Sequence, residues 1–291
     1  ATAHTFDVLV FSKTAGYRHA SIPDGIAAIQ KLGQDHGFNV TATEDAGVFT
    51  LETLQQYAAV VFLSTTGDVL NTQQQAAFEA YIQQGGGYVG IHAASDTEYD
   101  WPWYGRLVGA YFDSHPQIQS ATVKVADRVH PSTKHLPEYW VRTDEWYNYR
   151  ENPRGKVHVL AALDESTYSG GSMGHDHPIA WMHEFEGGRS WYTGGGHTRE
   201  SFTEPDFLDH LLGGILYASG DVTGEFDATN DNQYQVTVLN DNPSYPMALA
   251  VLPNYDVLYI ERRGDMKLWS KSTGRVTTAA EFDVDSGRED G

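Results

Sequence analysis

Residues 85–96, GGGYVGIHAASD, place a histidine where a buried strand ends in a turn of small residues. In α/β enzymes such a turn can hold a serine or cysteine nucleophile above the sheet. Here the residue is His92, and the chain contains no cysteine, which excludes thiolate catalysis, disulfides and thiolate-bound zinc. Because a buried histidine is costly unless its nitrogens find partners, we expect His92 to face a ligand or a metal. The alternative is a core histidine bonded to Asp96 or to a backbone carbonyl.

Further candidate residues lie in four other segments. In TGGGHTRESF (193–202), the glycines before His197 allow close approach of the backbone to a ligand. Asp113 and His115 in YFDSHP share a face if that stretch is extended, so they could chelate a metal or fix a histidine tautomer. The segments KTAGYRHAS and TDEWYNY supply a basic pair and a carboxylate beside aromatic rings.

These residue types indicate acid–base or metal-assisted chemistry on a polar substrate. We predict catalytic roles for His92, His197 and Glu145. The predicted substrate-binding residues are Arg18, His19, Asp96, Trp146, Tyr147 and Arg199. The predicted metal ligands are His92, Asp113, His115 and His197, and a sulfur-free set of this kind suits zinc or manganese. The remaining histidines in less organised contexts are expected at the surface: His4, His36, His130, His135 and His158.

The surrounding pattern alternates short apolar runs with helical periodicity from Phe6 to about Gly220. Strands are expected at 6–12, 38–42, 58–64 and 87–92. Helices are expected from Ile22 with Ser21 at its N-cap, after Thr50, over 71–84 and over 206–219. Residues 119–196 are rich in β-forming and aromatic residues. This order predicts an α/β fold with a doubly wound, mostly parallel sheet, whose ligands bind at the carboxyl ends of the strands.

The composition changes after the first 220 residues. We predict an α/β domain over 1–220, an acidic linker over 221–233 and an all-β segment over 234–291, with short strands at about ten-residue spacing typical of a propeller blade or small sandwich. Because one blade is an incomplete propeller, we expect the native protein to continue. The opening ATA suggests the remnant of signal-peptide cleavage, so we expect a secreted, extracellular or periplasmic protein.

The net charge of the chain argues against two classes of binding partner. The chain has 39 acidic and 19 basic residues, a formal net charge of −20. That field repels nucleic-acid phosphates and anionic lipid surfaces, so neither is expected as a partner. No stretch is apolar enough for a transmembrane helix. The sequence indicates no oligomeric state.

Residues 6–219 resemble the ThuA-like family, named for trehalose utilisation, within the class I glutamine amidotransferase-like fold (flavodoxin-like). The resemblance is carried, in order, by GYRHAS, GGGYVGIHAASD, GAYFDSHP, DEWYNY, HPIAW and GRSWYTGGGHTRESF. It implies a carbohydrate ligand, either a glycoside or an oxidised (3-keto) sugar. It implies no glutaminase activity, because the cysteine of true amidotransferases is absent.

Residues 234–291 resemble the opening of a glucose/sorbosone dehydrogenase-type propeller, carried by YPMALAVLPNYDVLYIERRGDMKLWSKSTGRV. Pyrroloquinoline quinone is implied only if a full propeller follows. Three hypotheses remain: a carbohydrate-active hydrolase or lyase, a non-catalytic sugar-binding module attached to a sugar-oxidising propeller, and a purely structural domain.

Overall fold

The computed structural model describes residues 6–222, 239–240 and 243–284. The chain divides into two compact units, residues 1–233 and 234–291, which we describe separately. The expected signal-peptide remnant, His4 and most of the expected linker lie outside the described residues. Within the described ranges, no helix is both long and apolar enough to cross a membrane.

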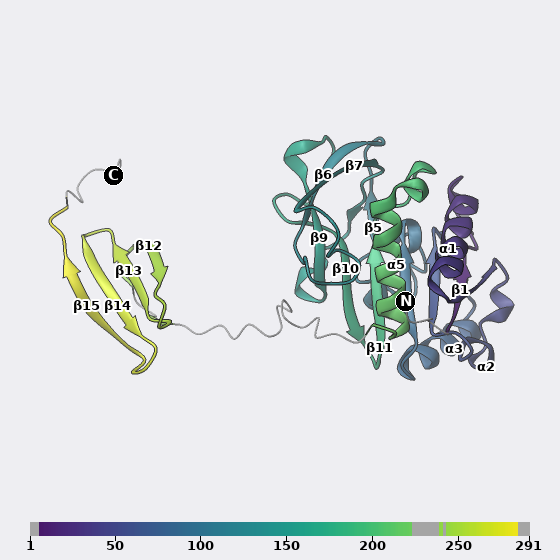
Figure 1. Cartoon of the computed structure of the whole chain (residues 1–291), viewed down its shortest axis with the longest axis horizontal. Helices are drawn as coiled ribbons and strands as arrows, with labels where there is room; N and C mark the ends of the chain where they lie inside the picture. Colours follow the sequence, from purple (N-terminus) through teal and green to yellow (C-terminus); the bar gives the residue numbers. More distant parts are fainter. Residues whose placement is uncertain (1–5, 223–238, 241–242, 285–291) are drawn as a thin grey trace. The chain divides into compact units, whose positions relative to one another are not determined.

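A nine-stranded sheet forms the centre of the first unit (Figure 1), in the order β2-β1-β3-β4-β11-β10-β9-β6-β7. The first five strands pair in parallel and are β2 (Asn39–Thr43), β1 (Asp7–Phe11), β3 (Ala59–Leu63), β4 (Gly87–Ile91) and β11 (Gly188–Thr193). The other strands pair antiparallel and are β10 (His177–Phe185), β9 (His158–Asp164), β6 (Gln119–Val125) and β7 (Tyr139–Asp144).

The prediction of an α/β fold is therefore confirmed, but the sheet is mixed and not mostly parallel. β10 and β11 are joined by a tight turn at Glu186 and Gly187, both with positive φ, and such a turn can only return the chain antiparallel. The β-rich stretch expected over 119–196 supplies the antiparallel half. The flavodoxin-like, doubly wound arrangement stays a prediction.

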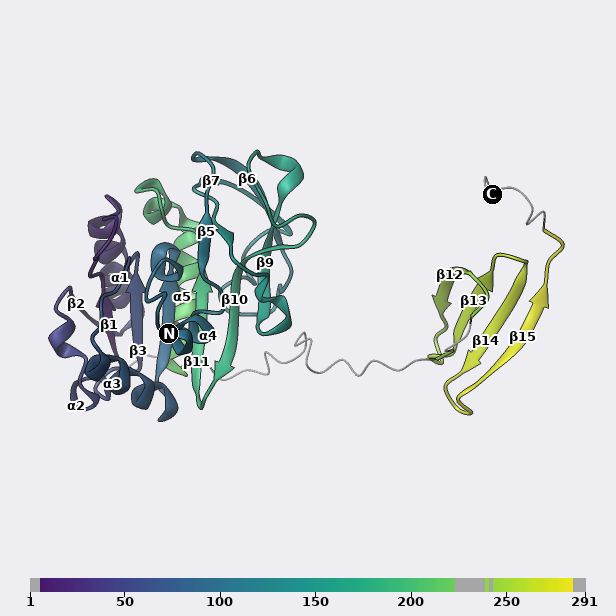
Figure 2. The same ribbon diagram turned by 180° about the vertical axis from the view of Figure 1, so that it is seen from behind.

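Helices cover both faces of the sheet. α1 and α5 lie on the face nearer the viewer in Figure 1, and α3 and α4 lie on the face turned forward in Figure 2. The helices are α1 (Ile22–His36), α2 (Leu51–Leu54), α3 (Thr72–Gln83), α4 (Pro102–Val108) and α5 (Pro205–Ser219). Gly214 lets α5 lie directly against β11, because a Cβ there would be only 2.5 Å from the indole of Trp191. The core between the layers includes the wholly buried strands β3 and β4.

Ser21, at the start of α1, contacts a segment that is distant in the sequence. Ser21 occupies the predicted N-cap position, but its side chain makes no capping hydrogen bond. Its hydroxyl instead donates to the backbone oxygen of Gly196 at 3.2 Å. The loop after β1 is thereby tied to the loop after β11.

Two histidines expected at the surface are buried. His130 is 0% exposed and His158 is 6% exposed. The reason is a buried carboxylate: Asp127 accepts from His158 Nε2 at 2.8 Å and from the backbone nitrogen of His130 at 3.0 Å. This network compensates for the burial of the polar groups.

The second unit contains a four-stranded antiparallel sheet in sequence order. Its strands are β12 (Pro246–Val251), β13 (Val257–Glu261), β14 (Asp265–Ser270) and β15 (Arg275–Glu281). The prediction of an all-β segment is confirmed. Its resemblance to a dehydrogenase propeller stays a prediction.

Candidate active site

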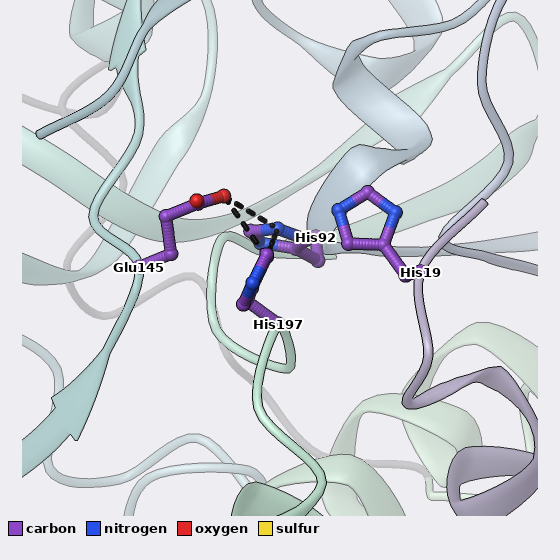
Figure 3. A group of neighbouring side chains, drawn as sticks. All are labelled: His19, His92, Glu145 and His197. Atoms are coloured by element: carbon purple, nitrogen blue, oxygen red, sulfur yellow. Dashed lines mark hydrogen bonds and ion pairs between the residues drawn. The ribbon is translucent and has the colours of Figure 1, made fainter. Parts of the chain in front are cut away.

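Four ionisable side chains converge at one edge of the sheet (Figure 3). His19, His92, Glu145 and His197 each offer one nitrogen or oxygen atom, and these four atoms lie within 4.8 Å of one another. We call this group the His/Glu cluster. In Figure 3, Glu145 and His19 approach from opposite sides, with His92 and His197 between them.

The topology explains how three of the four residues meet. His19 lies in the loop after β1, His92 directly follows β4, and His197 lies in the loop after β11. These strands run in the same direction, so their carboxyl ends lie along one edge. That edge is where ligands bind in open α/β sheets.

His92 is held in a strained conformation. Its φ is 51°, in the left-handed region that only glycine adopts freely, and the short 3-10 helix η2 (His92–Ser95) begins there. Its backbone oxygen accepts from the Tyr192 hydroxyl at 2.8 Å. Its Nδ1 lies 2.8 Å from the backbone oxygen of Gly194. Because a carbonyl oxygen only accepts, Nδ1 carries the proton and the lone pair of Nε2 points toward the cluster.

Glu145 is the cluster's carboxylate. Its Oε2 lies 2.9 Å from His197 Nδ1 and 3.4 Å from His92 Nε2. Its Oε1 lies 3.0 Å from Nδ1 of His115, whose side chain is 43% exposed. Burial by itself would raise the pKa of Glu145, but the hydrogen bond from His197 and the positive charge that the neighbouring imidazoles can carry outweigh it and hold the pKa below its usual value.

His19 is the least satisfied member. It is 4% exposed, and its buried Nδ1 has no hydrogen-bond partner among the described residues. Its ring stands nearly perpendicular to those of His92 and His197, with centroids 4.9 and 5.0 Å away. Burial, and then the positive charge that His92 and His197 can carry, lowers the pKa of His19 to about 3.

Glu145 directly follows β7, the edge strand of the sheet, and one face of β7 is buried. Alternate residues of β7 are buried, so Trp140, Arg142 and Asp144 point to the same side. Arg142 lies over the ring of Phe207 in α5 at 4.5 Å and pairs with Asp144 at 2.7 Å. Asp144 in turn accepts from the backbone nitrogen of Gly196 at 2.8 Å. This face fixes the end of β7 against the loop that carries His197.

Asp144 and Arg142 support the cluster, although neither is among the site residues predicted from the sequence. Both are buried, and burial by itself would raise the pKa of Asp144, but the charge of Arg142 holds it below the usual range. The signal was present in YWVRTD, where alternation puts the arginine and the aspartate on one face. In a strand, an arginine and an aspartate two residues apart lie on the same face, so they indicate a buried ion pair if that face packs against the core.

Several other predicted residues lie near the cluster. The Tyr147 ring packs on His92 with centroids 4.1 Å apart and is 2% exposed. Asp96 accepts from the Tyr99 hydroxyl at 2.5 Å; burial raises its pKa, although that hydrogen bond lowers it in part. Trp146 is 1% exposed and donates to the Gln119 oxygen, so it offers no ring face to a ligand.

The remaining predicted residues are not brought into the cluster. Arg18 pairs with Glu44 on the surface. Arg199 pairs with Asp24 at 2.8 Å and is 67% exposed. Asp113 accepts from the neighbouring Ser114 hydroxyl and is exposed. Of the predicted metal ligands, the structure thus brings together His92 and His197, and His19 and Glu145 complete the group.

The chemistry of the cluster follows from its donor set. Three imidazoles and a carboxylate can transfer protons, bind a divalent metal, or polarise an oxygen atom of a substrate. The cluster is exposed on the side of its member His197 and of its neighbour His115, whose side chains are 18% and 43% exposed.

Comparison with known proteins agrees with this architecture. The ThuA family profile, described as trehalose utilisation, matches residues 7–218. A putative ThuA-like protein from Bacteroides uniformis is similar in structure, with a TM-score of 0.64 and 26% identity, over 75% of this chain and 93% of that one. One from Parabacteroides merdae has a TM-score of 0.62 and 21% identity, over 76% and 93%.

A cytoplasmic protein from Salmonella typhimurium LT2 has a TM-score of 0.54 and 11% identity, over 73% of this chain and 99% of that one. At their low identities, the Parabacteroides and Salmonella proteins bear on the fold alone. No curated protein is similar enough to match the chain.

Proposed function

This chain belongs to the ThuA family of trehalose utilisation, and from that premise we propose that its first unit is an enzyme acting on a glycoside or an oxidised (3-keto) sugar. The family places the chain in carbohydrate metabolism. The proposal goes further and assigns a reaction, hydrolase- or lyase-like, to the His/Glu cluster.

The observation that carries the proposal is the cluster's position. Four ionisable side chains from four separate segments meet at the carboxyl edge of the parallel strands, and one of them, His92, is held at a strained φ of 51°. Strain and buried polar groups are costly, and proteins retain them chiefly at functional sites. The position that holds a cysteine in amidotransferases carries this histidine, so we propose no glutaminase activity.

The contacts suggest how a sugar would lie. Glu145 is fixed by His92 and His197 on one oxygen and by His115 on the other. A sugar entering from the exposed side of His115 meets imidazole and carboxylate groups that can exchange hydrogen bonds with its hydroxyl or carbonyl oxygens. Asp96 and its partner Tyr99, both half-buried, lie beyond the end of β4 and could bind further hydroxyls.

A sugar-binding module without catalysis is the alternative. Its main support in the sequence was the aromatic run after Glu145, whose rings could stack on a sugar. Trp146 and Tyr147 are 1% and 2% exposed, so these rings belong to the core and the stacking surface is not available. This burial favours the enzyme over the binding module.

The test is turnover by the purified 291-residue chain. Trehalose, other disaccharides and their 3-keto derivatives are incubated with the protein, and products are followed by mass spectrometry. We expect one substrate class to be consumed, and His92→Ala and Glu145→Gln to abolish its consumption. His36→Ala, an exposed histidine at the end of α1, is the matched control and should keep full activity. Sugar binding without turnover would favour the alternative, and turnover unaffected by either variant would place the reaction elsewhere.

A further inference from the structure

We propose that His19, His92, His197 and Glu145 form a binding site for a divalent metal ion, with zinc preferred over manganese. The inference names the cofactor of the proposed reaction site. It rests on the proposed function only in treating the cluster as the place where the sugar reacts.

Within the His/Glu cluster, electron-pair acceptors face one another. The Nδ1 proton of His92 is committed to the Gly194 oxygen at 2.8 Å, so Nε2 presents a lone pair. That atom lies 3.4 Å from Oε2 of Glu145 and 3.2 Å from Nδ1 of His197. Two acceptors, His92 Nε2 and Glu145 Oε2, are thus buried side by side and share the one proton of His197 Nδ1, an arrangement that a cation in their place stabilises.

The imidazole of His19 is buried, and its Nδ1 has no hydrogen-bond partner among the described residues. More than nine-tenths of this residue is buried, and no hydrogen bond to its side chain is found among the described residues. An unsatisfied buried polar group costs about 1–3 kcal/mol. In Figure 3 its ring turns one nitrogen toward His92 and the other away. Coordination of a metal by the nitrogen facing the cluster would satisfy this side chain.

The spacing suits a small four-coordinate ion. Ligands held at about 2.0–2.1 Å around tetrahedral zinc lie roughly 3.4 Å apart. The contacts among His92, His197 and Glu145 span 2.9–3.4 Å, and His19 closes the group within 4.8 Å. A modest inward movement of His19 completes the shell. Three nitrogens and one oxygen favour zinc, because manganese prefers sites richer in oxygen.

The surroundings also resemble the outer shell of a metal site. Metal-bound histidines usually donate their second ring nitrogen to a carbonyl or carboxylate, as His92 does to Gly194. His115 contacts the second oxygen of Glu145 from the exposed side and so holds that carboxylate. Asp113, a ligand expected from the sequence, is not part of the proposed set. A metal in this place would polarise a sugar oxygen bound beside it.

The experiment measures metal binding without any sugar. The full chain is stripped with a chelator, and Zn²⁺ or Mn²⁺ is titrated into it near neutral pH by calorimetry, with metal content checked by elemental analysis. We expect a one-to-one zinc complex, weaker manganese binding and a higher melting temperature with zinc. His19→Ala and Glu145→Gln should each weaken zinc binding by more than the ~10–100-fold that loss of an outer-shell partner causes.

The controls separate the possible failures. His36→Ala removes an exposed imidazole at the last residue of α1 and should leave the zinc affinity unchanged. Because His19 has no hydrogen bond to lose among the described residues, His19→Ala should fold normally, which circular dichroism checks. Three results would overturn the inference: no stoichiometric zinc binding, tighter binding of manganese than of zinc, or unchanged zinc affinity in both His19→Ala and Glu145→Gln. Full sugar turnover by the metal-free chain would overturn the metal site and support the proposed function. Stoichiometric zinc binding with no turnover of any sugar would support the metal site and count against the proposed function.

Discussion

Asp144 holds the backbone of His197: its Oδ1 lies 3.1 Å from the His197 nitrogen, while its Oδ2 accepts from Gly196 and from Arg142. Asp144 is wholly buried, and the next residue, Glu145, makes the contact with the His197 ring. Two adjacent carboxylates therefore have different tasks. The first fixes the loop of His197, and the second faces the imidazoles of the His/Glu cluster.

Replacing Asp144 with asparagine should destabilise the protein strongly. The change removes the charge that pairs with Arg142, which is itself buried. Breaking a buried ion pair on one side typically costs ~3–5 kcal/mol, and Glu204, which also contacts Arg142, should keep the loss near the lower value. Urea unfolding measures it. Asp164→Asn, at an exposed carboxylate that caps a turn, should change the free energy of unfolding by less than ~0.5 kcal/mol. Equal effects of the two changes would contradict this account.

Gly196→Ala should damage both stability and the site. Gly196 has φ of 108°, and a Cβ there would lie 3.0 Å from Ile91, the last residue of β4. We expect the free energy of unfolding to fall by at least ~1 kcal/mol. Sugar turnover should also fall, because the loop carries His197. Gly174→Ala is the matched control, because Gly174 also has positive φ, 81°, but has nothing within 4 Å of its would-be Cβ. That variant should lose stability by backbone strain alone and keep activity.

The stability of the first unit should fall as the pH drops below about 6.5. Burial lowers the pKa of His210 to about 3, and burial likewise lowers that of His130 to about 3. Between the two pH values the unfolded chain binds protons that the native protein does not, so the stabilisation is complete above the window and lost on acidification through it. Each histidine contributes up to about 1.4 kcal/mol per pH unit there.

Urea unfolding at a series of pH values, with the wild type and His210→Gln, checks this slope. His210 accepts from Thr193 and donates to the Ser132 oxygen, so glutamine keeps a donor and an acceptor while removing the titration. We expect a shallower slope for that variant and an unchanged slope for His36→Gln at the exposed end of α1. A His210→Gln slope as steep as the wild type would assign the acid sensitivity to other groups.

Local patterns in the sequence predicted the parallel half of the fold well. The buried runs and helical periodicity of residues 6–92 match β1, α1, β2, β3, α3 and β4 closely, because each element there is decided by its own residues. The antiparallel half was recognised only as β-rich. Strand order there depends on tertiary pairing, and nothing local in β7 indicates that it is the edge strand.

The site was predictable where a residue directly follows a strand. His92 and His197 were identified from the turn and glycine signals before them, and both lie in the cluster. The spacing of Asp113 and His115 predicts that both are metal ligands, yet only His115 reaches Glu145, because that contact depends on how β5 (Phe112–Ser114) pairs with β8 (Asn148–Tyr149). The aromatic run after Glu145 was expected to bind a sugar, but composition does not reveal which rings the core buries.

Tyr192→Phe should reduce sugar turnover more than it reduces stability. The Tyr192 hydroxyl donates to the backbone oxygen of His92 at 2.8 Å and lies 3.0 Å from the Ser95 hydroxyl, so it holds both ends of η2. Without it, His92 loses a support for its left-handed φ, and its backbone oxygen keeps only the longer hydrogen bond from the Ser95 hydroxyl at 3.3 Å, so the loss in stability should be that of one hydrogen bond, ~0.5–1.5 kcal/mol. We expect at least a tenfold drop in kcat/KM, which corresponds to about 1.4 kcal/mol, with the far-ultraviolet circular dichroism spectrum preserved. Tyr57→Phe is the control, because no hydrogen bond of its hydroxyl is found among the described residues and Tyr57 precedes the amino end of β3, whereas the cluster lies at the carboxyl ends of these strands. Turnover by Tyr192→Phe equal to that of Tyr57→Phe would show that η2 keeps His92 in place without this hydroxyl.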